Sequence, residues 1–89
     1  MKSIECTCDA MPVQYEGELD NGERFYFRAR WSHWGFGVGQ TKDAAVANCV
    51  MWEPWGNDFA SASHMPLDEA ERIIAECERK YLEDQSCAT

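Results

Sequence analysis

The chain has 89 residues, of which 45% are hydrophobic and 12% aromatic, and it carries a formal net charge of −8. This length and apolar content predict a single domain, residues 1–89, and argue against a disordered tail. No apolar run approaches the ~20 residues that a membrane span needs, and a secretory signal is not recognised, so we expect a cytoplasmic protein without membrane contact. The acidic balance disfavours direct binding of nucleic acid and favours a basic partner.

The chain has five cysteines, an odd number that argues against a disulfide framework. Cys49 and Cys77 lie in apolar helical patterns and are predicted to be small core residues. Cys6 and Cys8 form a close pair, but neither histidine of the chain stands at a recognised ligand spacing from them. We therefore expect no metal and no other cofactor.

Residues 1–11 are interpreted as a loose lead-in, after which two alternating segments predict a β-hairpin around "DNG". A two-residue loop would set polar residues against apolar ones. A three-residue loop with Gly22 in the left-handed conformation instead sets Tyr15 opposite Phe27 and Gly17 opposite Phe25. The longer loop is therefore predicted.

A third strand, which contains "GFGVG", is predicted to follow a two-residue turn at Ser32-His33, with Trp31 facing Trp34. In this register, three glycines lie on the face away from the core, opposite two arginines and a tyrosine. The expected pairs are Arg30 with Gly35, Arg28 with Gly37, and Tyr26 with Gly39.

Thr41 is a plausible N-cap for a helix of small residues that ends before Glu53-Pro54. Residues 59–65 alternate weakly and predict, at most, a fourth strand. A clearer helix begins at Pro66, and residues 85–89 are expected to be frayed. The predicted fold is α+β: a three-stranded antiparallel sheet, or a four-stranded one, with two helices in the order β-β-β-α-(β)-α.

The glycine-rich stretch matches neither a dinucleotide fingerprint nor a P-loop, because Gln40 stands where each motif needs another residue. The two histidines have no nucleophile or orienting acid nearby in sequence. The sequence therefore predicts a protein that is not an enzyme.

One candidate surface is the outer sheet face, where basic and aromatic side chains beside glycines have the chemistry of a single-strand platform. Glu16 and Glu18 are expected to neutralise much of this stripe, so an ion-paired or helix-covered face is the simpler interpretation. The candidate residues are Tyr26, Arg28, Arg30, Gly35 and Gly37.

The other candidate surface is acidic, because carboxylates spaced along a small rigid scaffold can imitate a row of phosphates. A solvated helix face would give the same linear pattern. The candidate partner-binding residues are Glu16, Glu18, Asp20, Glu23, Asp68, Glu69, Glu71, Glu76 and Glu78.

In size, charge and layout, this short acidic chain with a β-meander and helices resembles the small phage-encoded inhibitors of the anti-CRISPR type. The resemblance implies a non-enzymatic inhibitor in the host bacterial cytoplasm, one whose DNA-mimicking surface blocks the basic DNA-binding groove of a CRISPR effector. The passage "GQTKDAAVANC" is similar to the strand–Gly-x-Thr–helix step of HicB-type antitoxin domains, which implies a toxin-neutralising domain. A nucleic-acid-binding module that uses the arginines of the sheet face is a third interpretation.

Overall fold

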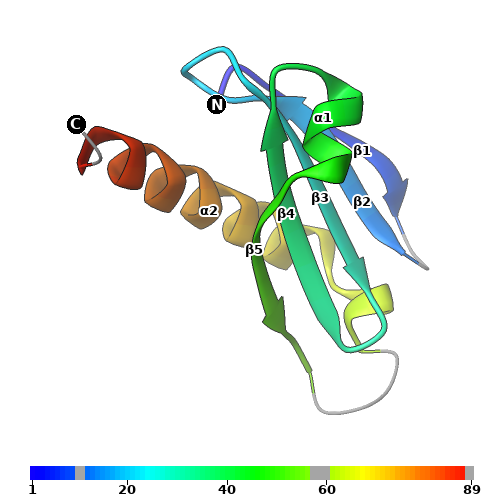
Figure 1. The fold of residues 1–89 in the computed structure, drawn as a ribbon. Helices are drawn as coiled ribbons and strands as arrows, with labels where there is room; N and C mark the ends of the chain where they lie inside the picture. The colour runs from blue at the N-terminus through cyan, green and yellow to red at the C-terminus, as the bar shows by residue number, and fades with distance from the viewer. Residues whose placement is uncertain (10–11, 57–60, 88–89) are drawn as a thin grey trace.

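The computed structural model describes residues 1–9, 12–56 and 61–87. Five strands form one antiparallel sheet in chain order, with α1 on one face and the long helix α2 across the other (Figure 1). The elements are β1 (Ser3–Asp9), β2 (Val13–Glu18), β3 (Arg24–Arg30), β4 (His33–Gly39), α1 (Lys42–Ala47), β5 (Cys49–Pro54), the 3-10 turn η1 (Ala62–His64) and α2 (Leu67–Cys87). We call the side that faces α2 the inner face and the opposite side the outer face.

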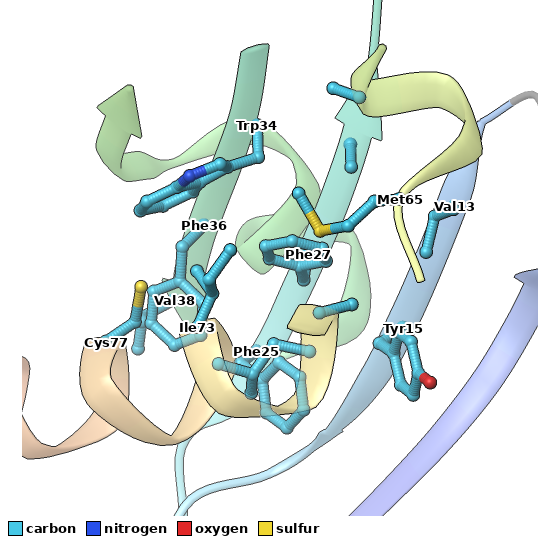
Figure 2. Packing of buried hydrophobic residues seen from close by; sticks show 14 of the residues in the cluster. Val13, Tyr15, Phe25, Phe27, Trp34, Phe36, Val38, Met65, Ile73 and Cys77 are labelled. Atoms are coloured by element: carbon cyan, nitrogen blue, oxygen red, sulfur yellow. The ribbon is translucent and has the colours of Figure 1, made fainter. Parts of the chain in front are cut away.

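The hydrophobic core lies between the inner face and α2. Apolar residues alternate along β2, β3 and β4, so that one side of each strand is buried. Phe25 stacks on Phe36 with ring centroids 5.7 Å apart, and Phe27 stacks on Trp34 at 5.9 Å. Figure 2 shows these rings gathered with residues of α2, which contributes Ala70, Ile73, Ile74 and Cys77 to the cluster. This arrangement belongs to the predicted α+β class.

The predicted β2–β3 hairpin is confirmed in both register and turn. Tyr15 pairs with Phe27 and Gly17 with Phe25. Gly22 has a φ of 90°, and the Leu19 N–H donates to the Glu23 carbonyl at 2.8 Å, which closes the three-residue loop. Only a residue without a Cβ adopts this φ at little cost, so the sequence signal and the turn agree.

The predicted register of β3 against β4 is wrong by two residues. Arg30 pairs with His33 and Arg28 with Gly35, so the turn is Trp31-Ser32, one residue earlier than expected. Trp31 has a φ of 60°, which is unfavourable for an aromatic residue. Its N–H donates to the Ser63 hydroxyl at 2.8 Å, and its carbonyl accepts from Ala62 at 2.8 Å, so contacts with η1 hold the turn. A shift of two leaves every side chain on its predicted face.

The prediction of three or four strands is wrong, because the sheet has five. Strand β1 lies within the predicted lead-in, and β5 begins within the end of the predicted first helix and continues into the predicted loop at Glu53-Pro54. That helix stops at Ala47, because the Asn48 side chain donates to the Val38 carbonyl at 2.8 Å and turns the chain back along β4.

The candidate strand at 59–65 is also wrong over the residues that the structure describes, where Ala62–His64 form η1; residues 59 and 60 lie outside the description. At the C-terminus, α2 continues to Cys87, past the predicted onset of fraying at residue 85. Residues 88 and 89 of that predicted tail lie outside the description.

Candidate binding groove on the outer sheet face

Two of the outer-face glycines are explained by the packing of α1. A Cβ at Gly37 would collide with the Ala45 carbonyl and lie 3.1 Å from the Asn48 carbonyl oxygen. A Cβ at Gly39 would lie 2.6 Å from the Ala44 Cβ. Such approaches need glycine, so α1 covers this end of the face and Gly37 supports packing there.

Gly35 has different surroundings, because α1 does not reach it. The nearest atoms to a Cβ built there are the Cys49 Sγ at 3.5 Å and the Trp52 Cδ1 at 3.8 Å, which are ordinary contacts. The register places Arg28 of β3 on one side of Gly35 and Trp52 of β5 on the other. Because Gly35 has no side chain, a hollow lies between Arg28 and the indole ring of Trp52.

This hollow, which we call the outer groove, has a volume of about 320 Å³. A smaller hollow of about 190 Å³ continues from it toward α1 and shares Arg28 and Gly35 with it. The outer groove is lined by Arg28, Arg30, Trp31, His33, Gly35 and Trp52.

Aromatic rings form much of the rim of the outer groove. The Trp52 side chain is 58% exposed, and its ring centroid lies 4.9 Å from that of His33. On the other side, the Arg30 guanidinium carbon lies 4.8 Å from the centroid of the Trp31 ring, a cation–π arrangement that holds the charge at the groove.

The arginines of β3 are not neutralised as the sequence predicts. Glu16 forms an ion pair with Lys42 at 3.3 Å, and Glu18 lies 3.9 Å from the Lys2 amine. Within the described part of the chain, Arg28 and Arg30 form no ion pair. The Arg28 Nε is also buried without a hydrogen-bond partner among these residues. The groove is therefore a local cationic site on an acidic protein.

The acidic residues proposed as a partner surface do not gather on one face. Glu16 and Glu18 lie on the outer face of β2, opposite the layer formed by α2. Glu78 is 9% exposed and accepts the Asp20 N–H at 3.1 Å, while the amino group of Met1 pairs with both carboxylates. Glu78 and Asp20 therefore connect the N-terminus and the β2–β3 loop to α2.

Other carboxylates of the acidic set also have internal partners. Glu71 accepts a hydrogen bond from the Tyr15 hydroxyl at 2.9 Å. The pKa of Tyr15 is raised, mainly by burial and secondly by this hydrogen bond. Glu23 accepts the Tyr81 hydroxyl at 2.9 Å, and the same two causes raise the pKa of Tyr81. Both tyrosines therefore stay neutral donors at physiological pH.

On the exposed side of α2, cations stand between the acids. Arg72 pairs with Glu69 and lies 3.5 Å from Glu76, and Arg79 lies 3.2 Å from Glu83. Of the proposed acidic set, Asp68 alone has no ion pair or hydrogen bond among the described residues. Interleaved charges of this kind are typical of a solvated helix face.

The cysteines occupy both kinds of environment. Cys77 is buried as predicted, and its burial raises the pKa of the thiol to about 12. Cys49 is exposed on β5, which corrects its prediction as a core residue. Cys6 and Cys8 flank an irregularity in β1. No group of three or more potential metal ligands occurs among residues 1–9, 12–56 and 61–87.

Another hollow, of about 580 Å³, lies between β5 and α2. Its apolar wall includes Trp34, Met51 and Ile73, and its rim mixes acids with the cations Arg72 and Lys80. It therefore presents no single charge to a partner, whereas the outer groove does.

The alternation in the sequence correctly predicts the outer face for Tyr26, Arg28, Arg30 and the glycines, but it does not indicate His33 and Trp52 as groove residues. Trp52 was assigned to a helix, so its position beside Gly35 was hidden. Strand β5 also contains a bulge that breaks simple alternation, because Met51 pairs with Phe36 and Cys49 with Gly37. Val50 is the extra residue, so Cys49 and Trp52 both lie on the outer face although they are three positions apart.

Comparisons of the chain with protein-family models, curated proteins and solved structures gave no match. In the part of the chain that the structure describes, no helix is both long and apolar enough to cross a membrane.

Proposed function

We propose that the protein is a non-enzymatic binding protein that holds an anionic partner in the outer groove. The supporting observation is the pair Arg28 and Arg30, which line a hollow and have no ion-pair partner among the described residues. Four other cations of the chain are paired, namely Lys2, Lys42, Arg72 and Arg79. Unpaired guanidinium groups suit carboxylate or phosphate oxygens, which they bind through charge-assisted hydrogen bonds.

The net charge of −8 limits how such a partner binds. Electrostatic interactions between exposed charges fall off over ~10 Å at 0.1 M salt, so the whole-molecule field matters mainly during approach. Contacts made inside the groove are screened less. We therefore expect a partner that places a few anionic groups in the groove and keeps the rest of its charge away from the acidic surface.

The proposal is tested by comparing two double variants that remove the same charge from different places. Arg28→Gln with Arg30→Gln changes the groove, and Arg79→Gln with Lys80→Gln changes the exposed side of α2. The probes are a fluorescent oligothymidylate of about twelve nucleotides and a fluorescent polyglutamate peptide, measured by anisotropy at low salt.

We expect at least one probe to bind the wild-type protein. A hydrogen bond to a charged group contributes about 1.5–3 kcal/mol, so the groove variant should weaken binding by at least ~10-fold. The α2 variant should change it less than ~2-fold. The proposal is wrong if neither probe binds, or if both variants weaken binding equally.

A second candidate is an acidic inhibitor of a basic nucleic-acid-binding protein, such as a CRISPR effector subunit, acting in the host cytoplasm. The excess of 16 acidic over 8 basic residues supports it. Asp68 is a carboxylate without an ion pair or hydrogen bond among the described residues. In this case Asp68→Lys, which adds positive charge there, should reduce inhibition of target DNA binding by the effector. An unchanged inhibition, or none from the wild-type protein, would count against this candidate.

A further inference from the structure

We infer that the anionic partner of the outer groove is a single-stranded nucleic acid, with one base stacked on Trp52 and neighbouring phosphates on Arg28 and Arg30. This inference rests on the proposed function and narrows it to one class of partner. The supporting observation is that three adjacent strands place a cationic residue (Arg28), a residue without a side chain (Gly35) and an aromatic residue (Trp52) side by side.

A row of three residues crosses the sheet at Gly35. Arg28, Gly35 and Trp52 are register partners on three adjacent strands. Adjacent strands are ~4.8 Å apart, so the outer two residues of the row stand roughly 10 Å apart across a position without a side chain. A flat ring can enter such a slot edge-on, because a Cβ at Gly35 would meet nothing closer than 3.5 Å.

The aromatic side chain at the edge of this row is exposed. Trp52 is 58% exposed although it belongs to a strand of the sheet. His33 packs against it with a centroid separation of 4.9 Å, which supports the ring from the β4 side. An exposed and supported indole is a stacking platform for a base.

The combination of cationic and aromatic walls suits a nucleic acid better than an acidic peptide. A peptide carboxylate would use Arg28 and Arg30 but would leave Trp52 without a stacking partner. A nucleotide presents both a phosphate and a planar base, and so uses the cationic wall and the aromatic wall of the same groove.

The groove suits a single strand better than a duplex. Bases in a duplex are stacked on each other, and their faces are closed to an external ring. A duplex would also bring a second row of phosphates toward a protein with a net charge of −8, which repels it. A flexible single strand can present one or two nucleotides and leave the remainder in solvent.

The test uses the wild-type protein, Trp52→Ala, Trp52→Phe and the groove double variant, Arg28→Gln with Arg30→Gln. Because Trp52 is mostly exposed, its replacement should leave the fold intact, which circular dichroism checks. Four fluorescent probes are titrated at low salt: oligothymidylate, an abasic strand of equal length, a hairpin duplex and the polyglutamate peptide.

We expect oligothymidylate to bind best. Trp52→Ala should weaken this binding by about 10-fold and Trp52→Phe by about 2-fold, because stacking requires a ring rather than an indole. The abasic strand should bind the wild-type protein as weakly as oligothymidylate binds Trp52→Ala. The affinity for oligothymidylate should fall with salt with a log–log slope of about −1.4 for two phosphate contacts.

The outcomes separate the two proposals. If polyglutamate binds through the arginines and oligothymidylate does not, the nucleic-acid inference is wrong and the proposed function stands. Equal binding of oligothymidylate and the abasic strand, or no effect of Trp52→Ala, also overturns the inference. Preference for the duplex overturns it too, and failure of every probe overturns both proposals.

Discussion

Replacing Gly37 by alanine should unfold the protein at a much lower temperature, because the new Cβ collides with the backbone of α1. It would meet the Ala45 carbonyl and lie 3.1 Å from the Asn48 carbonyl oxygen. Overpacking against backbone costs about 2 kcal/mol. The shift of α1 would also strain the hydrogen bonds between Asn48 and Val38, of 2.8 and 3.2 Å, at about 1 kcal/mol each. The total is about 4 kcal/mol.

For a domain of this size, 1 kcal/mol corresponds to about 4–8 °C, so the melting temperature should fall by about 16–32 °C. Thermal unfolding followed by circular dichroism measures this shift. The matched control is Gly35→Ala, whose Cβ would lie 3.5 Å from the nearest atom and should change stability by less than about 0.5 kcal/mol. A melting temperature of Gly37→Ala within a few degrees of wild type would refute the packing of α1 on the glycine face, as would equal losses in both variants.

Three further predictions concern stability and reactivity. Ser63→Ala removes the acceptor of the Trp31 N–H and should lower the free energy of unfolding, measured in urea, by about 1–3 kcal/mol; no change would show that η1 does not hold the turn. Gly22→Ala should cost about 1 kcal/mol in the same assay, because φ is 90° there; a neutral effect would contradict the left-handed turn. Burial raises the pKa of Cys77 to about 12, so at pH 8 this thiol should react with iodoacetamide far more slowly than exposed Cys6, as peptide mass spectrometry can measure. Because the fold favours the protonated thiol, its contribution to stability is complete below pH 9 and is lost as the pH rises toward 12; equal labelling of the two thiols in the native protein would contradict the burial.

The β2–β3 hairpin was predictable because its local signals agree. The "DNG" turn fixes the loop, and the alternation of apolar residues allows one register in which both faces match. The β3–β4 turn was not predictable in the same way, because Trp31 adopts a left-handed conformation that its own residue type disfavours. Its position depends on hydrogen bonds to η1, which lies some 30 residues later in the chain.

The two edge strands were missed for different reasons. Strand β1 is exposed at nearly every residue, so it has no buried face from which a period of two could be recognised. Strand β5 begins only one residue, Asn48, after the six-residue helix α1. Helical periodicity therefore carried the prediction past the end of the helix at Ala47.

Strand β5, which the sequence pattern did not predict, supplies the aromatic wall of the candidate site. The alternation of β3 placed Tyr26, Arg28 and Arg30 on the outer face, but only the pairing of β5 with β4 brings Trp52 beside them. The partners of Glu16 and Glu18 are Lys42 and Lys2, and neither pairing was predicted from the strand pattern. Contacts between elements, rather than local pattern, thus determine both the charge and the shape of the groove.

The central claim is that the outer groove, and not the acidic side of α2, contacts the partner. The most direct measurement is a titration of the isotopically labelled protein with oligothymidylate, followed by amide and indole chemical shifts. We predict the largest changes at Arg28, Arg30, Gly35 and the indole N–H of Trp52, with little change along the exposed side of α2. Changes concentrated on α2 around Arg72 and Arg79, or no changes at any residue, would contradict it.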